Sequence, residues 1–261
     1  MARLAGKRQL GSPGRRLGAV SSEAGQPGAG EGERAYRQAR FELPAEGTEI
    51  VLVRHGESMP ARLSTPFDRL DGQSDPDLAP EGVEQAEAVG ARLAGEGPFA
   101  AIYVSPLRRT HQTAAPLAAR LGMVPRVEPD LREVLLGEWE GAAFRRNLAE
   151  GHPTALAMLE EERWDVIPGA ESNEAFAARL RAAVDRIAAA HRGERVVAVS
   201  HGGSIGMILA EATGSRPFAF VGADNASISQ LVVAGDRWIL RRFNDTAHLE
   251  AGFEMASEPL T

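Results

Sequence analysis

Three short apolar runs, each followed by a helical pattern of ten or more residues, restrict the folds open to this chain. Buried strands are predicted over Thr48–Arg54, within "AAIYVSP" at residues 100–106, and over Val196–Val199. Strands separated by helices of this length form βαβ units, in which the strands lie parallel and helices cover both faces of the sheet. We therefore predict an α/β fold, a three-layer α/β/α sandwich with a mostly parallel central sheet.

The remaining patterns complete this arrangement. Amphipathic helices are predicted over residues 81–97, 107–122, 172–193 and 202–214, and Pro116 predicts a kink or an early break in the second of them. A helical region over residues 142–164 is interrupted near "GHPT". The runs at residues 226–235 and 237–243 form a hairpin, whereas the polar, proline-rich residues 59–82 predict no regular element.

The first forty residues differ from the rest in composition. They carry eight Lys and Arg against three acidic residues and contain eight glycines, but no Ile, Phe or Trp. Such a segment buries too little apolar area to offset the entropy of ordering. We expect residues 1–40 to be a disordered extension, with a transit peptide as the alternative, and residues 41–261 to form one domain.

Charge and composition exclude several classes of function. The formal net charge is −7, and residues 41–261 alone carry −12, which argues against a nucleic-acid surface. No stretch approaches the roughly 18 apolar residues that a membrane span needs, and we expect a cytoplasmic protein. The chain contains no cysteine, so disulfides, thiolate catalysis and Cys-ligated zinc are all excluded. Nothing in the sequence indicates an oligomeric state.

Each of the three predicted strands is followed by arginine or histidine side chains that can bind a ligand or take part in catalysis. The segments are "VLVRHG", "IYVSPLRR" and "VAVSHGG". Parallel strands present their carboxyl ends at one edge, so Arg54, His55, Arg109 and His201 are expected to converge there. Two guanidiniums and two imidazoles at one edge would bind an anion such as phosphate. A single histidine after a strand is more often a structural or exposed residue. Metal binding is the other alternative, but HxH and HxxxH spacings are absent and nearby arginines would repel a cation.

With "RHGES", "SPLRRTHQTA", "LREVLLGEWEG" and "SHGG" in this order, the chain resembles the histidine phosphatase superfamily over about 200 residues, from Ile50 through "NDTAHL". The family includes cofactor-dependent phosphoglycerate mutases and many small-molecule phosphatases. The resemblance implies a phosphoglycerate mutase-like fold and phosphoryl transfer through a phosphohistidine. It implies that the reaction needs no metal and no other cofactor. It also implies that the substrate is a small phosphorylated metabolite.

The resemblance also assigns roles to residues. It implies that His55 is the nucleophile and Glu133 the proton donor. It implies that the phosphate is bound by Arg54, Arg109, His201 and Gly202. A neutral imidazole is nucleophilic near pH 7, and an acid beside an apolar segment suits protonation of a leaving alkoxide. The alternation of Glu138 and Glu140 with Trp139 predicts that these two carboxylates point away from the site.

Two departures separate the chain from the mutases of the family. Ala61 occupies the position where an asparagine is expected, and no Arg-Tyr-Gly segment follows Glu133. "GEWEG" and "IPGAES" resemble the phosphatase branch instead. We therefore expect a metal-independent phosphomonoesterase. Mutase-type phosphoryl transfer and a catalytically weak phospholigand-binding protein are the alternatives.

Selection of the substrate falls to residues outside these motifs. Ser58, Ser64 and Thr65 are candidates to complete the phosphate shell in place of the asparagine. Residues Phe144–Trp164 are a candidate lid, whose Arg145, Arg146 and Arg163 would bind a carboxylate or a second phosphate of the substrate. The alternative for these arginines is an ordinary solvated helical face.

Overall fold

The structure is a computed structural model and describes residues 36–249. Contacts divide the chain into residues 1–41 and 42–261, and the α/β fold lies in the second unit. Residues 36–41 contain no helix or strand. The expected disordered extension over residues 1–40 falls, except for its last five residues, outside the described residues and stays a prediction.

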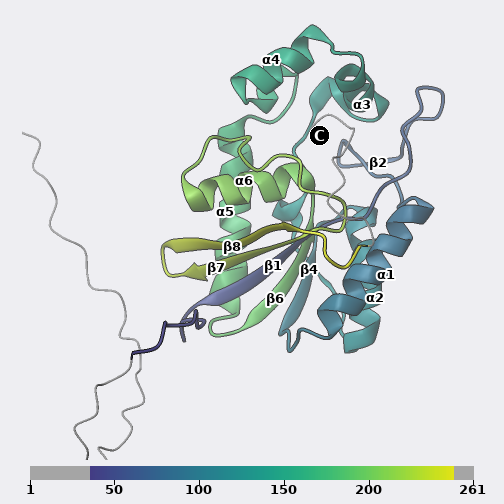
Figure 1. Cartoon of the computed structure of the whole chain (residues 1–261). Coiled ribbons are helices and arrows are strands. Elements are labelled where there is room, and N and C mark those ends of the chain that lie inside the picture. Colours follow the sequence, from purple (N-terminus) through teal and green to yellow (C-terminus); the bar gives the residue numbers. More distant parts are fainter. Residues whose placement is uncertain (1–35, 250–261) are drawn as a thin grey trace, which may run out of the picture. The chain divides into compact units, whose positions relative to one another are not determined.

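A six-stranded sheet forms the centre of the fold, in the order β5-β4-β6-β1-β7-β8 (Figure 1). Four strands are parallel: β1 (Thr48–Arg54), β4 (Ala101–Val104), β5 (Arg126–Val127) and β6 (Arg195–Ser200). The hairpin of β7 (Ile228–Ala234) and β8 (Arg237–Asp245) adds two antiparallel strands beside β1. The mostly parallel sheet predicted from the sequence is confirmed.

Each face of the sheet is covered by a pair of helices, as Figure 1 shows. Side chains alternate along β1, so Val51 and Val53 pack in the core under α1 (Pro80–Ala94) and α2 (Arg108–Leu121). Ile50 and Leu52 face the opposite core with α5 (Asn173–Ala190) and α6 (Gly202–Thr213). This arrangement is the predicted three-layer sandwich. Within residues 36–249, no helix has the length and apolar character needed to cross a membrane.

Helix α2 continues through Pro116 to Leu121, so the early break that the proline predicted is wrong. The ring removes one backbone hydrogen bond, but tertiary packing offsets this loss. Leu117, the next residue, is buried in the core, and α1 approaches so closely that a Cβ at Gly90 would lie 3.0 Å from the Pro116 side chain.

The loop between β1 and α1 contains a short hairpin that the sequence analysis missed. Strands β2 (Arg69–Leu70) and β3 (Gln73–Ser74) pair in antiparallel fashion around Asp71 and Gly72, both of which have positive φ. Asp-Gly is the strongest short sequence signal for such a turn. The signal was present within residues 59–82, where no regular element was expected.

Beyond the carboxyl ends of the strands lie two short helices, α3 (Ala142–Ala149) and α4 (Pro153–Glu161) (Figure 1). They confirm the predicted helical region with its break near "GHPT". Three 3₁₀ turns complete the described elements: η1 (Pro129–Leu131), η2 (Gly137–Trp139) and η3 (Trp164–Val166).

A close contact between α1 and the loop after β1 generates a test of the packing. A Cβ at Gly82 would overlap the main chain of Glu57, so Gly82→Ala should lower the free energy of unfolding by about 1–3 kcal/mol. At Gly95, a Cβ would meet only the Arg92 carbonyl at 3.5 Å, and Gly95→Ala should change stability by less than about 1 kcal/mol. Urea denaturation measures both, and equal stability of the two variants would contradict the described approach.

Candidate active site

The histidines predicted to converge lie side by side at the carboxyl edge of the sheet. Strand β1 pairs with β6, and the amide of His55 donates to the Ser200 carbonyl at 3.0 Å. His55 and His201 therefore follow neighbouring strands, and their ring centroids are 5.1 Å apart. Both side chains are buried, and His201 has no exposed surface.

Hydrogen bonding fixes the orientation of the His55 ring. Its Nδ1 lies 2.7 Å from the carbonyl of Gly56, and a carbonyl only accepts, so this contact assigns the proton to Nδ1. Nε2 then carries the lone pair. His201 approaches Ser105, with its Nε2 2.8 Å from the hydroxyl oxygen. The structure thus presents one imidazole nitrogen suited to nucleophilic attack.

Both imidazoles are kept neutral. Burial lowers the pKa of His55 well below its ordinary value, and the charges of Arg109 and Arg54 lower it further. The pKa of His201 is also well below the ordinary value because of burial, Arg109 and His55. A neutral His55 is the form that can attack an electrophile.

Of the two arginines, Arg109 is buried and Arg54 is partly buried. Arg54 donates from Nη1 to the Ala223 carbonyl, and Arg109 donates from Nη1 to the Ser74 carbonyl at 3.0 Å. Burial lowers the pKa of Arg109 to about 10 and also lowers that of Arg54, with Glu133 countering the effect in both cases. Arginine does not lose its proton in proteins at neutral pH, so both guanidiniums are charged.

Gly202 opens helix α6 directly behind the Arg54 side chain. A Cβ at this position would lie 3.3 Å from Nε of Arg54, a tight contact that glycine avoids. The first turn of a helix has backbone N–H groups without partners inside the helix, so this end of α6 favours an anion. Two cations and a helix N-terminus thus face the same region as His55.

Glu133 reaches this region from the loop after η1. Its carboxylate accepts hydrogen bonds from the amides of Val134 at 2.9 Å, and Gly203 and Ser204 at 3.0 Å each. Val134 is buried, but the immediate partners of the carboxylate are polar. The apolar setting that the sequence analysis expected around Glu133 therefore describes only part of its surroundings.

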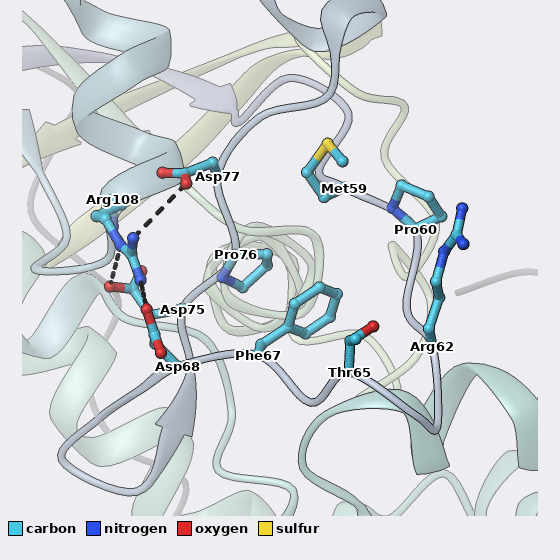
Figure 2. Close-up of a pocket in the computed structure, with 10 residues that line it drawn as sticks. All are labelled: Met59, Pro60, Arg62, Thr65, Phe67, Asp68, Asp75, Pro76, Asp77 and Arg108. Carbon is cyan, nitrogen blue, oxygen red and sulfur yellow. Dashed lines mark hydrogen bonds and ion pairs between the residues drawn. The ribbon is translucent and has the colours of Figure 1, made fainter.

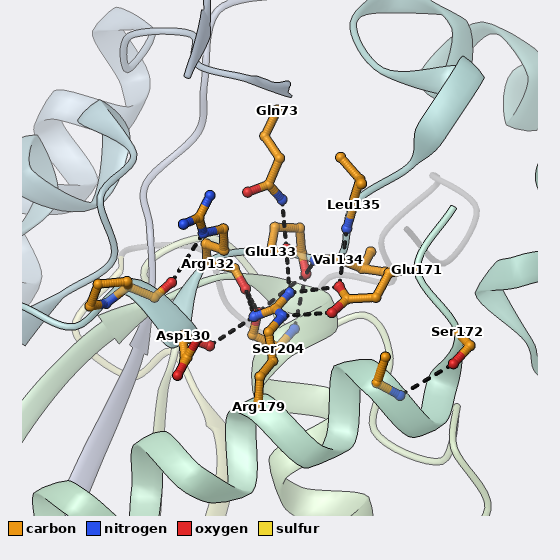
Figure 3. A network of polar contacts seen from close by, with 12 residues as sticks. Gln73, Asp130, Arg132, Glu133, Val134, Leu135, Glu171, Ser172, Arg179 and Ser204 are labelled. Carbon is orange, nitrogen blue, oxygen red and sulfur yellow. Dashed lines mark hydrogen bonds and ion pairs between the residues drawn. The ribbon is translucent and has the colours of Figure 1, made fainter. Parts of the chain in front are cut away.

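The main chain around Glu133 is held by Arg179 of α5, which Figure 3 shows. The guanidinium donates to the carbonyls of Asp130, Arg132 and Glu133 at 2.7–2.8 Å. It also forms two bonds to the Glu171 carboxylate at 2.7 and 2.9 Å, so all five of its N–H groups are used. A second donor, Nε2 of Gln73, reaches the Glu133 carbonyl at 2.6 Å.

These groups open into a cavity of about 830 Å³. Of the residues predicted to form the site, those that line it are Arg54, His55, Ser58, Arg109, Glu133, Arg145, Arg146 and Gly202. His201 does not line the cavity, because it lies fully buried against His55.

The structure does not bring three of the substrate-binding candidates to this cavity. Ser64 is exposed on the loop before β2, and Thr65 lines a separate pocket of about 270 Å³ (Figure 2). Arg163 is held in ion pairs with Glu161 at 3.3 Å and Asp165 at 3.0 Å. Side-chain chemistry suggested these residues, but no periodic pattern indicated which way their loops turn.

Arg108, which precedes Arg109, points away from the cavity. Figure 2 shows its ion pairs with Asp68, Asp75 and Asp77. Asp75 also accepts a hydrogen bond from the Arg108 amide at 2.7 Å. These contacts anchor the loop after β3 to the start of α2, which fixes the helix that carries Arg109.

Among the residues that line the cavity but were not assigned to the site from the sequence are Glu140, Asn225 and Gln73. Glu140, expected to point away, is buried and accepts hydrogen bonds from the amide and hydroxyl of Ser74 at 2.8 and 2.7 Å. Asn225 donates to the His55 carbonyl at 2.9 Å. The tertiary contacts of these residues leave no local signal in the sequence.

Within residues 36–249, no three His, Asp or Glu side chains gather in a way that could hold a metal ion. The charges near His55 are mainly those of Arg54 and Arg109, which would repel a metal cation. The arrangement can instead bind an anion and offer it a neutral imidazole nitrogen and a nearby carboxyl group.

Comparison with known proteins gives consistent matches. Residues 50–246 match the histidine phosphatase superfamily (branch 1). The chain is 32% identical over 239 residues to a metal-independent phosphoserine phosphatase of Arabidopsis thaliana, covering 88% of this chain and 98% of that protein. It is 34% identical over 219 residues to phosphoglycerate mutase-like protein 4 of the same plant, covering 82% and 92%.

Solved structures of other proteins also resemble this chain. A mycobacterial glucosyl-3-phosphoglycerate phosphatase superposes with a TM-score of 0.64 at 30% identity, covering 77% of this chain and all of the other. A phosphoglycerate mutase from Bacillus anthracis, with a TM-score of 0.65 and 24% identity, supports the fold alone.

The charges around the two histidines predict how they titrate. Arg109 is the first charged group that lowers the pKa of each, so Arg109→Met should raise both values toward the ordinary one near 6.5. The sign follows because removing a cation favours the imidazolium. NMR of the imidazole carbons between pH 4 and 8 measures the change. Arg120→Met, at an exposed position in the last turn of α2, should leave both pKa values in place, and an equal shift in the two variants would contradict this.

Proposed function

The chain belongs to the histidine phosphatase superfamily, and from this membership we propose that it hydrolyses phosphomonoesters of small metabolites through a phosphohistidine on His55. The observation that carries the proposal is the neutral His55, with its Nε2 lone pair, in the same cavity as the guanidiniums of Arg54 and Arg109, which lower its pKa. The chain is accordingly a phosphoric monoester hydrolase.

Binding of the phosphoryl group falls to the cations and the helix end. Arg54 and Arg109 offer two positive charges to the two negative charges of a phosphomonoester, and the Gly202 amide adds one backbone N–H donor, since the next two amides of α6 bind Glu133. His201 lies directly behind His55 and supports its ring. These groups neutralise charge on the equatorial oxygens of the transferring phosphoryl group without requiring a metal ion.

The reaction divides into two displacements at phosphorus. In the first, Nε2 of His55 attacks phosphorus, the P–O ester bond breaks, and the leaving alkoxide takes a proton from Glu133. In the second, the Glu133 carboxylate removes a proton from water, which attacks phosphorus and breaks the P–N bond. His55 regains its lone pair and phosphate leaves. One difficult substitution is thereby replaced by two easier ones.

Phosphatase activity is favoured over mutase activity by this chain's own residues. Ala61 has no polar side chain to contact the phosphate, and "EVLLGEWEG" contains none of the arginines that follow the acid in mutases. The relatives include proteins of both names, and two of them are called phosphatases at 30% identity or above. The cytoplasmic location and the extension over residues 1–40 stay predictions.

Removal of the nucleophile tests the mechanism. His55→Ala should lower hydrolysis of p-nitrophenyl phosphate by about a thousandfold or more, because the covalent route is lost. Wild type should retain its activity in EDTA and form an acid-labile phosphoenzyme on rapid quench, which the variant should lack. His111→Ala, at an exposed position of α2, is the matched control. Substantial activity in His55→Ala would overturn the proposal.

The role of Glu133 predicts a dependence on the leaving group. Glu133→Gln should lower kcat for alkyl phosphates by about a hundredfold and for p-nitrophenyl phosphate by less than about tenfold, since nitrophenolate leaves without a proton. Glu138→Gln, on the exposed residue five positions on, should match wild type. Equal losses on both kinds of substrate would assign Glu133 a structural role instead.

A further inference from the structure

The peptide bond that follows the nucleophile is bound at both of its polar groups. The carbonyl of His55 accepts a hydrogen bond from Nδ2 of Asn225 at 2.9 Å and a longer one from the amide of Ala226 at 3.3 Å. On the other side of the peptide, the amide of Gly56 donates to the hydroxyl of Thr113 at 3.0 Å. Helix α2 and the loop before β7 therefore meet at this one peptide.

The chemistry of Thr113 fixes the direction of both of its bonds. Its hydroxyl lies 2.7 Å from the carbonyl of Arg109, one turn earlier in α2, and a carbonyl only accepts, so the hydroxyl hydrogen is used there. The lone pairs of the oxygen are then left for the Gly56 amide, which only donates. Thr113 and Gly56 are both buried, so removing the hydroxyl would leave a buried amide unpaired.

Gly56 transmits this restraint to the imidazole. Its carbonyl accepts from Nδ1 of His55 at 2.7 Å, and this bond directs Nε2. A Cβ at Gly56 would overlap the carbonyl of Gly82, so the residue is packed against α1 as well as bound to α2. A rotation of the Gly56 backbone would therefore move the acceptor that sets the direction of the His55 ring.

Thr113 also joins the nucleophile to a phosphate-binding arginine. Its one hydroxyl contacts the amide next to His55 and the main chain of Arg109. In the proposed reaction, Arg109 holds the phosphoryl oxygens while His55 attacks, and the attacking and leaving atoms lie roughly in line at phosphorus. A displacement of about 1 Å can slow such a reaction a hundredfold. The relative position of these two residues is therefore what the attack requires.

We propose that Thr113 and Asn225 are positioning residues, which hold the His55–Gly56 peptide so that Nε2 of His55 stays in line with a phosphoryl group bound at Arg109. The inference rests on the proposed function, because it concerns the attack by His55. In this role each of the two residues acts through the main chain of the nucleophile.

Substitutions of similar size separate the Thr113 hydroxyl from its packing. Thr113→Val should slow phosphorylation of His55 by p-nitrophenyl phosphate, measured by rapid quench at saturating substrate, by about tenfold to a hundredfold. The inhibition constant of inorganic phosphate should change by less than about threefold, since both guanidiniums remain. Thr113→Ser keeps the hydroxyl and should restore the phosphorylation rate to within about threefold of wild type.

Thr48→Val is the matched control. Thr48 and Thr113 are each 1% exposed, and the Thr48 hydroxyl also binds main-chain carbonyls, those of Ala188 and His191 at 2.9 and 2.8 Å. Thr48 begins β1, at the opposite end of the strand from His55. This variant should lose stability in urea denaturation as Thr113→Val does, but it should phosphorylate at the wild-type rate.

Asn225 gives a second test at a position that is only partly buried. Asn225→Ala removes one of the two donors to the His55 carbonyl, and the amide of Ala226 remains. The expected loss in phosphorylation rate is therefore smaller, about fivefold to twentyfold. This variant decides the inference if Thr113→Val does not fold.

Four results would overturn the inference: a wild-type phosphorylation rate in Thr113→Val or Asn225→Ala, a loss in Thr113→Ser equal to that in Thr113→Val, the same loss in Thr48→Val, or a loss of phosphate affinity as large as the loss of rate. The last result would assign Thr113 to binding of the anion. Failure of the proposed function has a different signature, because His55→Ala would then stay active and wild type would form no phosphoenzyme.

Discussion

A buried and a partly buried guanidinium beside two neutral imidazoles are the constraint on which the site depends. Removing Arg54 and Arg109 from water is costly, and it is tolerated because each donates to a main-chain carbonyl and each is stabilised by nearby carboxylates. The same cations, together with burial, keep His55 and His201 neutral. A phosphomonoester that enters this region supplies the negative charge that the buried cations lack. The cation cluster that costs free energy in the folded protein is thus also the feature that favours binding of phosphate.

Glu133 is held in place by two independent sets of contacts. The amides at the start of α6 bind its carboxylate, and this is the helix that follows His201. Arg179 of α5 and Gln73 of β3 bind its main-chain carbonyl. Arg179 also forms a partly buried ion pair with Glu171. This ion pair fixes the guanidinium that binds the loop of Glu133. The position of Glu133 relative to His55 therefore follows from how α5 and α6 pack on the same face of the sheet.

The sequence predicts the parts of the site that depend on the sheet and misses those that depend on loops. Arg54, His55 and His201 follow strands that are neighbours, so a parallel sheet alone brings them together. Glu140 lies in the cavity only because residues 136–140 turn back on Ser74, and no periodicity encodes that turn. The candidates on loops fail for the same reason, since Ser64 and Thr65 had the right chemistry without any local signal of direction. His191 is likewise buried against Tyr103 by packing between distant elements, which no local pattern indicates.

His55 and Arg109 are held by different contacts from those that hold α3, so substitutions affect the two regions differently. His55 and Arg109 are attached to strands and a helix whose side chains fill the two cores, so a substitution that moves them disturbs the whole sheet. Helix α3 lies beyond the strand ends, where Phe144 contacts Trp139 and Trp164 at ring-centroid distances of 6.4 and 6.2 Å. These aromatic contacts hold the backbone of α3, whose residues line one wall of the cavity. Substitutions in α3 can therefore change this wall while His55 and Arg109 keep their positions in the sheet and in α2.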